Sequence, residues 1–230
     1  VRNWEWPDLM TQTPLHKGVW GDFYFTEEAV PACDYVVILN NLDSELQTQC
    51  PPENIWRVIQ EPPVEEFKLW HLNPSYAFKS FTCDPDLSGP QYVRSQPMLP
   101  WHLNRDYDFL KAASLPIKTK KLSWITSTKS IYEGHKKRMR FLHDVGGKIE
   151  LLDLLGGGIY HMTHLATRMQ NEAVQKTLGF KSIADKWAGL APYKYSLAIE
   201  NAVIPDYWSE KIADCFLAWT LPIYYGCLNL

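Results

Sequence analysis

The side chains between positions 200 and 211 are of types that bind a phosphorylated ligand. Lys211 lies in the first turn of a helix expected to begin after Ser209, and Glu210 lies next to it. A diphosphate needs positive charge and free N–H donors, which a lysine and a helix N-terminus supply together. Glu210 can accept hydrogen bonds from the hydroxyls of a sugar. These residue types therefore predict an anion site that suits a nucleotide sugar.

Asn201 and Tyr207 belong to the same stretch and add polar contacts, with the ring of Tyr207 available for stacking. A purely structural interpretation also fits. An acid is favourable in a first helical turn, and a lysine there is commonly a solvated surface charge. Residue types alone leave these two interpretations open.

The elements that must position these side chains follow a pattern of parallel α/β layers, because apolar runs alternate with segments of helical period. The Val/Ile run at 35–39 suits a strand buried on both faces. The first half further predicts a helix at 64–71 and strands at 55–60, 76–82 and 92–98. The second half predicts strands at 122–126, 149–155, 195–199 and 221–225, helices at 133–144 and 209–219, a partly helical stretch at 163–187, and an exit loop at 156–158.

The unit from 195 to 225 is the one that carries the candidate site. Its helix has one apolar stripe at helical spacing, which predicts packing on a sheet. The stripe is made by Ile212, Cys215, Phe216 and Trp219. A crossover connection makes the flanking strands parallel and places the loop 200–208 at their carboxyl edge. Open α/β sheets bind ligands at that edge.

A change of composition between about residues 104 and 121 divides the chain. The apolar runs stop there and lysines gather at 118, 120 and 121. This change predicts two domains, residues 1–115 and residues 116–230.

Three segments in the second half carry a family resemblance. Residues 193–201 read Tyr-Lys-Tyr-Ser-Leu-Ala-Ile-Glu-Asn, residues 206–211 read Asp-Tyr-Trp-Ser-Glu-Lys, and residues 221–226 read Leu-Pro-Ile-Tyr-Tyr-Gly. Their order and spacing resemble the signature of the bacterial α-1,3-fucosyltransferases of glycosyltransferase family 10, and a match of this length is far more specific than a lone glycine motif. The resemblance implies an α/β, GT-B-like fold with two Rossmann-like domains facing a cleft. The N-terminal domain would bind the acceptor, and the C-terminal domain, which looks incomplete, would bind the donor.

The reaction that the resemblance implies is transfer of fucose from GDP-fucose, with inversion, to a hydroxyl of an oligosaccharide acceptor, such as O3 of N-acetylglucosamine or glucose. No metal or other cofactor is implied, because positive side chains can do what a divalent ion does in other transferases. The residues that match the family's donor-binding motif are Glu200, Asn201, Tyr207, Glu210 and Lys211.

A basic helix upstream adds a candidate cation. Residues 124–127, followed by residues 135–141, are similar to the family's strand and basic helix, whose arginine pairs with the donor diphosphate. Arg138 is assigned that role, with Arg140 as the alternative. An arginine fork suits phosphate oxygens better than a lysine does. Taken alone, this helix reads as a solvated basic face.

The first half adds a candidate catalytic carboxylate. The segment that ends at Glu61 resembles the family strand that ends in a general base, and Pro62 and Pro63 would stiffen the exit from that strand. Glu65 and Glu66 compete for the role. An isolated glutamate before two prolines is otherwise read as a loop charge.

Some positions depart from the family pattern. Ala202 stands where the family usually has serine, Trp219 occupies a small-residue position, and Leu228 falls where proline is expected. None of these removes a charged donor-site group. Family members continue beyond the position of Leu230, which is why an incomplete C-terminal domain is expected.

Bulk properties exclude several classes of partner. The formal net charge of −3 argues against nucleic acid. The five cysteines have no CxxC spacing, and the histidines form no metal set, with His161 and His164 as the nearest approach. No apolar run approaches the ~20 residues that cross a bilayer. A cytoplasmic protein is expected, or one held at a membrane surface by regions outside this chain. The sequence gives no indication of the oligomeric state.

Two other functions stay open on the sequence. One is a GT-B transferase that uses a different nucleotide sugar, because a diphosphate clamp specifies neither the base nor the hexose. The other is a non-catalytic, truncated module that binds a nucleotide sugar without turning it over.

Overall fold

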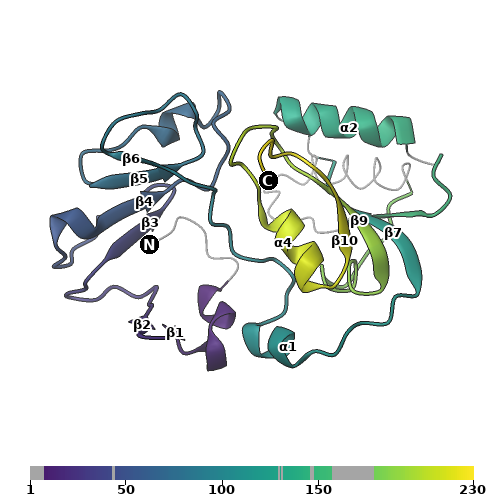
Figure 1. Ribbon diagram of the computed structural model, residues 1–230, viewed down its shortest axis with the longest axis horizontal. Helices are drawn as coiled ribbons and strands as arrows, with labels where there is room; N and C mark the ends of the chain where they lie inside the picture. Colours follow the sequence, from purple (N-terminus) through teal and green to yellow (C-terminus); the bar gives the residue numbers. More distant parts are fainter. Residues whose placement is uncertain (1–7, 43–44, 129, 131, 146–147, 157–178) are drawn as a thin grey trace.

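The protein folds into two four-stranded parallel β-sheets, one from each half of the chain, which lie beside each other (Figure 1). The computed structural model describes residues 8–42, 45–128, 130, 132–145, 148–156 and 179–230. The predicted α/β class with two parallel sheets is confirmed. The predicted loop residues Gly157 and Gly158, the histidines His161 and His164, and most of the stretch at 163–187 lie outside the described residues.

The first sheet has its strands in chain order. It contains β3 (Val36–Leu39), β4 (Ile55–Val58), β5 (Lys79–Thr82) and β6 (Tyr92–Arg94), all parallel and all within predicted strand ranges. In β3, Val36 and Ile38 are buried, but Val37 between them is 39% exposed. The prediction that this strand is buried on both faces is therefore wrong. The described connections in this half form only short 3₁₀-helices, which leave the second face open.

The helix predicted at 64–71 forms only a 3₁₀ turn, η4 (Lys68–His71). The chain before it makes successive i→i−3 bonds, from Phe67 N to Val64 O at 2.9 Å and from Trp70 N to Phe67 O at 2.8 Å. Prolines on both sides of this segment limit its length, and a helix this short is marginal without tertiary packing. A second 3₁₀-helix, η3 (Pro52–Asn54), precedes β4.

The second sheet has the strand order β10-β9-β7-β8. The members are β7 (Lys120–Ile125), β8 (Leu152–Leu155), β9 (Tyr193–Ile199) and β10 (Leu221–Tyr225). The chain winds from β7 to β8 on one side and then returns to place β9 on the other side of β7. This doubly wound order creates a switch point between the carboxyl ends of β7 and β9, where ligands bind in open α/β sheets.

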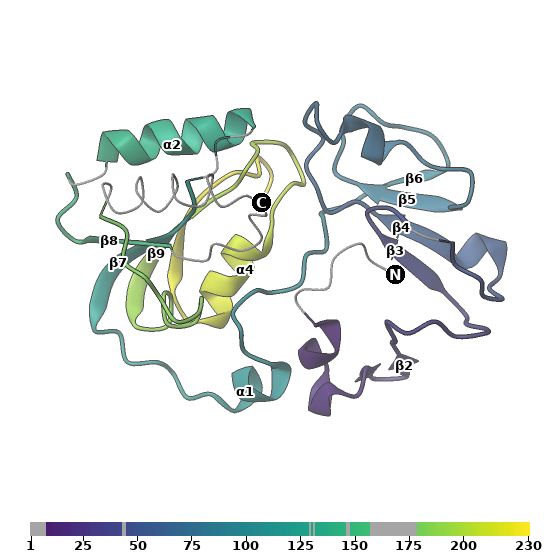
Figure 2. The ribbon, with the colours of Figure 1, turned by 180° about the vertical axis from the view of Figure 1, so that it is seen from behind.

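Two helices cover opposite faces of the second sheet (Figures 1 and 2). Alternate residues of a strand point to opposite faces. In β9, Ala198 packs in the cluster that includes Cys215 of α4 (Glu210–Leu217), whereas Leu197 packs in the cluster that includes Leu142 of α2 (Glu133–Val145). Both helices were predicted. Because each helix packs against the sheet, its position relative to the switch point is fixed.

The apolar stripe predicted for α4 is half right. Ile212 and Cys215 are buried against the sheet, but Phe216 and Trp219 are 59% and 61% exposed. The fully buried polar residue Asp214 takes an inward position instead. It does so because a lysine from another segment neutralises it, which periodicity cannot reveal. Trp219 follows the end of the helix with a positive φ of 57°, so its side chain leaves the helical register.

The segment between the sheets is more structured than its composition predicts. It contains α1 (Tyr107–Ala112), whose N-cap Asp106 accepts a hydrogen bond from Phe109 N at 2.7 Å. Before it, Leu103 is buried in the core of the second sheet. The domain limits 1–115 and 116–230 stay a prediction. The N-terminal part adds η1 (Leu9–Gln12), η2 (Pro14–His16) and a hairpin of β1 (Val19–Trp20) and β2 (Phe23–Tyr24).

The loop between β9 and α4 contacts the first half of the chain. Cys83, which follows β5, forms a buried cluster with Ala202 and Tyr207 of that loop. Beside the cluster, Arg94 pairs with Asp206. The two halves therefore meet at the same loop that carries most of the candidate ligand-binding residues.

Candidate functional site

A cavity of about 470 Å³ opens at the switch point and is lined from both halves of the chain. Thr126 and Ser127 line it directly after β7, and Asn201 lines it after β9. Lys211 of α4 and Glu61 of the first half also line it. The fold thus brings together residues that are distant in sequence at the edge where an α/β sheet binds its ligand.

Arg138 is a buried cation with neutral partners. It is 6% exposed, and it donates from one terminal nitrogen to Asn201 Oδ1 at 2.7 Å and from the other to Ser127 Oγ at 3.3 Å. Its Nε has no hydrogen-bond partner, and no carboxylate pairs with it among the described residues. Burial lowers the pKa of the guanidinium, but an arginine stays charged in a protein. The cavity therefore contains a positive charge that has no counterion in the part of the chain that the structure describes.

A close contact between α2 and the donor loop brings Arg138 into the cavity. Gly134 lies one helical turn earlier on the same face of α2, and a Cβ added to it would lie 1.6 Å from the backbone oxygen of Asn201. Only a glycine permits the helix to approach the loop so closely. The approach places the guanidinium of Arg138 within reach of the Asn201 side chain.

Gly134→Ala is accordingly expected to destabilise the protein by about 1–3 kcal/mol through overpacking. Helix propensity alone predicts the opposite sign, because alanine is favoured over glycine inside a helix by about 1 kcal/mol. Thermal unfolding of this variant beside Lys137→Ala, an exposed position of the same helix, measures the difference. A Gly134→Ala protein as stable as the parent would contradict the close contact.

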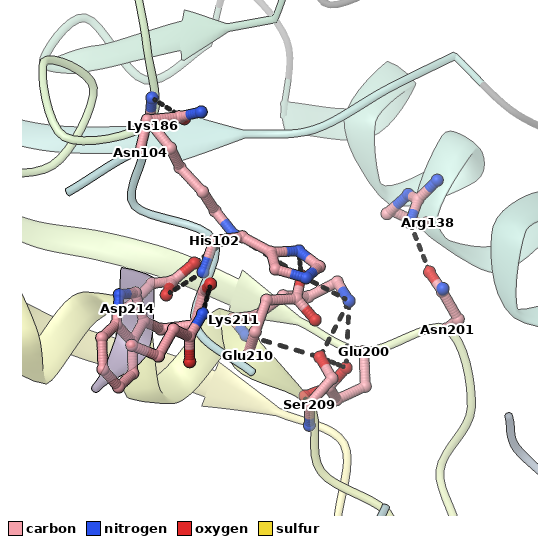
Figure 3. A network of polar contacts seen from close by, with 12 residues as sticks. His102, Asn104, Arg138, Lys186, Glu200, Asn201, Ser209, Glu210, Lys211 and Asp214 are labelled. Atoms are coloured by element: carbon pink, nitrogen blue, oxygen red, sulfur yellow. Dashed lines mark hydrogen bonds and ion pairs between the residues drawn. The ribbon is translucent and has the colours of Figure 1, made fainter. Parts of the chain in front are cut away.

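Lys211 is surrounded by residues from the end of β9 and the start of α4 (Figure 3). Its Nζ donates to Ser209 Oγ at 2.9 Å and lies 3.3 Å from Glu200 Oε2 and 3.6 Å from Glu210 Oε1. Burial works against its charge, but the two carboxylates outweigh burial and raise the pKa of Lys211. Lys211 and Arg138 share one cavity, as predicted, but among the described residues only Lys211 has carboxylates that balance its charge.

Lys186 is a cavity residue that the sequence analysis missed. Its Nζ lies 2.5 Å from Asp214 Oδ2 and 3.4 Å from Glu210 Oε1. Burial opposes the charge, and Asp214 and Glu210 together overcome it and raise the pKa of Lys186. Lys186 comes from the irregular segment before β9, where no periodicity marks an inward side chain. The signal that could have found it is Asp214, an acid on the otherwise apolar face of α4.

Glu210 is held as a carboxylate. Lys186, Lys211 and the ring of His102, whose Nδ1 lies 3.7 Å away, all approach its Oε1. Burial raises the pKa of Glu210, but Lys211 and Lys186 more than offset this and lower it overall. Burial lowers the pKa of His102 to about 4, so its ring is neutral near pH 7. Glu210 therefore enters the cavity as an acceptor of hydrogen bonds, as predicted for a group that binds hydroxyls.

Two of the predicted donor-binding residues lie behind the cavity. Glu200 is 2% exposed and accepts hydrogen bonds from Ser209 N at 2.8 Å and from Ser209 Oγ at 2.7 Å. The N–H of Ser209, which caps α4, is thus taken by a buried carboxylate, and the N–H of Lys211 bonds to Ser209 Oγ at 3.4 Å. The expectation that the start of α4 offers free N–H donors is therefore wrong at these two residues. Tyr207 is also buried, in the cluster with Cys83 and Ala202, and its ring is not available for stacking on a ligand.

Glu61 lines the cavity, whereas the competing residues Glu65 and Glu66 are exposed and do not. Strand β4 ends three residues before Glu61, and the Asn40 side chain accepts a hydrogen bond from Gln60 N at 2.8 Å, which fixes the exit of the chain. The alternative arginine, Arg140, has a 63% exposed side chain and lies near Glu133 at the surface. The structure therefore brings Arg138 and Glu61, and not these alternatives, to one cavity.

Several broader features bear on the class of site. The described residues contain no group of three or more His, Cys, Asp or Glu side chains that could hold a metal ion. All five cysteines are unpaired. A search of the described part of the chain finds no helix long and apolar enough to cross a membrane.

Comparison with known proteins gives short but specific similarities. No protein-family model matches the chain. A segment of 54 residues, 24% of this chain, is 39% identical to the α-(1,3)-fucosyltransferase FucT of Helicobacter pylori, and it covers 11% of that protein. The resemblance to α-1,3-fucosyltransferases that the motifs predict is confirmed over this segment.

Solved structures of α1,3-fucosyltransferases are also similar to this chain. One with GDP-fucose has a TM-score of 0.44 at 18% identity and is matched over 83% of this chain and 56% of its own. One with GDP has a TM-score of 0.43 at 17% identity and is matched over 89% of this chain and 58% of its own. The chain thus spans a little over half the length of these structures.

Proposed function

We propose that this chain contains the donor site and the catalytic base of a glycosyltransferase that moves fucose from GDP-fucose to a glycan hydroxyl, such as O3 of N-acetylglucosamine or glucose. The observation that carries the proposal is the buried guanidinium of Arg138 at the switch point of the second sheet, which among the described residues has only neutral partners and no partner for its Nε. The similarity to the H. pylori enzyme supports the choice of fucose, and GDP is what the resemblance of the motifs implies.

A buried charge without a counterion costs several kcal/mol of stability. Such an arrangement is expected where a ligand supplies the opposite charge, and the planar fork of an arginine fits the oxygens of a diphosphate. Asn201 and Ser127 hold the guanidinium in place without neutralising it. The site is therefore preorganised for an anion in a way that a solvated basic helix face is not.

The lysines serve this anion differently from Arg138. Three carboxylates, Glu200, Glu210 and Asp214, balance the two lysines. They hold the ammonium groups in fixed positions and remove their net charge from the cavity. Lys211 then contributes a directed hydrogen bond to the diphosphate more than a long-range attraction. Glu210, with Oε1 held by the lysines, has Oε2 for a hydroxyl of the ribose or of the fucose.

The proposed reaction is a single displacement. Glu61 takes the proton of the acceptor hydroxyl while the acceptor oxygen forms its bond to the anomeric carbon of fucose. The bond from that carbon to the phosphate oxygen breaks, and its electron pair leaves with GDP. Arg138 and Lys211 stabilise the charge that grows on the leaving diphosphate. Inversion follows because the attack and the departure occur on opposite faces of the sugar.

A nucleotide panel tests the donor assignment. At a concentration one hundred times its Kd, a ligand that binds only the folded state adds about 2.7 kcal/mol of stability, which is a rise in Tm of roughly 5–10 °C for a chain of this size. We expect that rise with GDP and GDP-fucose and a much smaller one with UDP. An equal rise with UDP favours a different nucleotide sugar. A rise with GDP but no transfer to any glycan favours a binding module, and no rise with any nucleotide rejects the proposal.

We also expect transfer to continue in the presence of a chelator. In the proposal, Arg138 supplies the positive charge that a divalent ion provides in metal-dependent transferases, and Lys211 adds a directed N–H donor. Initial rates of fucose transfer in excess EDTA, compared with rates in added Mg²⁺ or Mn²⁺, measure this. A rate that falls to background in EDTA and returns with one of the ions would overturn the expectation.

A further inference from the structure

Three aromatic rings line the cavity beside Glu61. Phe67 comes from the first half, Tyr132 directly precedes α2, and His135 lies in the first turn of α2. The ring centroids of Phe67 and Tyr132 lie 5.4 Å apart with an angle of 65° between their planes. Those of Tyr132 and His135 lie 4.8 Å apart with an angle of 31°. The rings form a continuous apolar wall that crosses from one half of the chain to the other, here called the aromatic wall.

The aromatic wall and the candidate base are close neighbours. Burial raises the pKa of Tyr132, and the negative charges of Glu61 and Glu66 raise it further. Phe67 belongs to the segment that leaves the first sheet through Glu61 and Pro62. Glu61 and the three rings line the same cavity, so a molecule that presents a hydroxyl to Glu61 is expected to reach the rings.

The aromatic wall also begins close to the diphosphate clamp. His135 and Arg138 lie three residues apart on α2, both are buried, and both line the cavity, so they share a face of the helix. Their separation along the axis is about 4.5 Å. The cavity thus has a charged end at Arg138 and Lys211 and an aromatic side at Glu61.

We propose that Phe67, Tyr132 and His135 form the acceptor subsite, and that its occupant is a pyranoside with a face of C–H groups, as gluco-configured sugars have. This inference rests on the proposed function. The aromatic wall covers the apolar face of the sugar while a ring hydroxyl points to Glu61. The guanine base is the less suitable occupant, because it is joined to the diphosphate at the end opposite the fucose, and Glu61 must act at the fucose end.

Substitutions in the aromatic wall should affect acceptor binding and spare donor binding. For Phe67→Ala and for Tyr132→Ala we expect the Kd of N-acetyllactosamine or lactose for the GDP-loaded protein, measured by titration calorimetry, to rise about tenfold. The Kd of GDP and the slow hydrolysis of GDP-fucose by water should stay within about twofold, which also reports that the variants are folded. Tyr132→Phe keeps the ring and should bind acceptor nearly as well as the parent. Phe78→Ala removes an exposed ring of the same half, outside the cavity, and serves as the matched control.

The outcomes separate the two proposals. An unchanged acceptor Kd in both alanine variants overturns the acceptor subsite, as does a loss of GDP affinity that matches the loss of acceptor affinity, since the aromatic wall would then hold the base. A parent protein that binds GDP but neither N-acetyllactosamine nor lactose overturns it as well. Failure of the parent to bind GDP is a failure of the proposed function and is seen before any variant is made.

Discussion

Arg138→Met is expected to abolish the rise in Tm that GDP causes while leaving the free protein at least as stable as the parent. Methionine has similar length and fills the same buried volume, and it removes a charge that has no counterion among the described residues. Replacing buried ionic groups with apolar ones of similar size is often neutral or stabilising. Loss of a charge that stabilises the leaving group should lower kcat/KM for transfer by about a hundredfold to a thousandfold.

Arg140→Met, two residues away on α2, is the control for this prediction. Its side chain is 63% exposed and lies near Glu133, so both the GDP shift and the rate of transfer should be unchanged. Equal losses in the two variants would mean that the whole basic face of α2 attracts the donor. A free Arg138→Met protein that unfolds several degrees earlier would mean that the guanidinium is part of the stability of the fold and not reserved for a ligand.

Glu61→Gln is expected to remove turnover and keep the donor bound. The amide has the size of the carboxylate and can still accept a hydrogen bond, but it cannot take the proton of the acceptor hydroxyl. General-base catalysis contributes about a hundredfold to ten-thousandfold, so kcat should fall by that factor with the Kd of GDP within about twofold. Steady-state transfer and calorimetric titration of GDP measure the two quantities separately.

Glu65→Gln and Glu66→Gln are the matched controls for this prediction. Both residues belong to the same segment as Glu61, and both are exposed and outside the cavity lining. Their rates should equal that of the parent. A rate for Glu61→Gln that also equals the parent would remove this residue from the chemistry and leave proton transfer to another group or to water.

The parts of the fold that could be predicted are those where local signals agree with tertiary packing. Strand β10 (Leu221–Tyr225) has the limits that its apolar run predicts, and α4 begins after Ser209, which caps it by accepting from Lys211 N. The parallel pairing of β9 with β10 follows from the single helix that connects them. In each case, the residues that specify the element are neighbours in sequence.

The predictions that failed concern side chains whose environment comes from elsewhere in the chain. Phe216 and Trp219 have the spacing of a buried stripe, but Asp214 faces inward because Lys186 neutralises it there. Lys186 lies in an irregular segment, so no periodicity in the sequence could predict that its side chain points inward. For Glu200 the donor-binding role stays a prediction, and what its motif could not show is that its carboxylate contacts Ser209 and Lys211 within the protein.

Residue types alone were enough to choose some members of the candidate site. An arginine in a basic helix and a glutamate at a strand exit could be chosen as candidates, and the fold brings Arg138 and Glu61 to one cavity. What the sequence could not show is the balance of charge. The sequence predicts Lys211 and Arg138 as a pair of cations for one diphosphate, but carboxylate neighbours neutralise Lys211, which leaves Arg138 as the member of the pair without a counterion among the described residues.

The contact of the β9–α4 loop with the first half also limits how the two halves can separate. Tyr207 packs on Cys83 and Asp206 pairs with Arg94, so the segment that presents Asn201 is anchored on both sides of the cavity. A hinge motion that widened the entrance would have to expose the Tyr207 ring and would pull on the Asn201 amide that orients Arg138. Opening of the cavity and weakening of nucleotide binding are thus coupled. GDP, the product of the proposed reaction, would therefore bind most weakly when the cavity is most open.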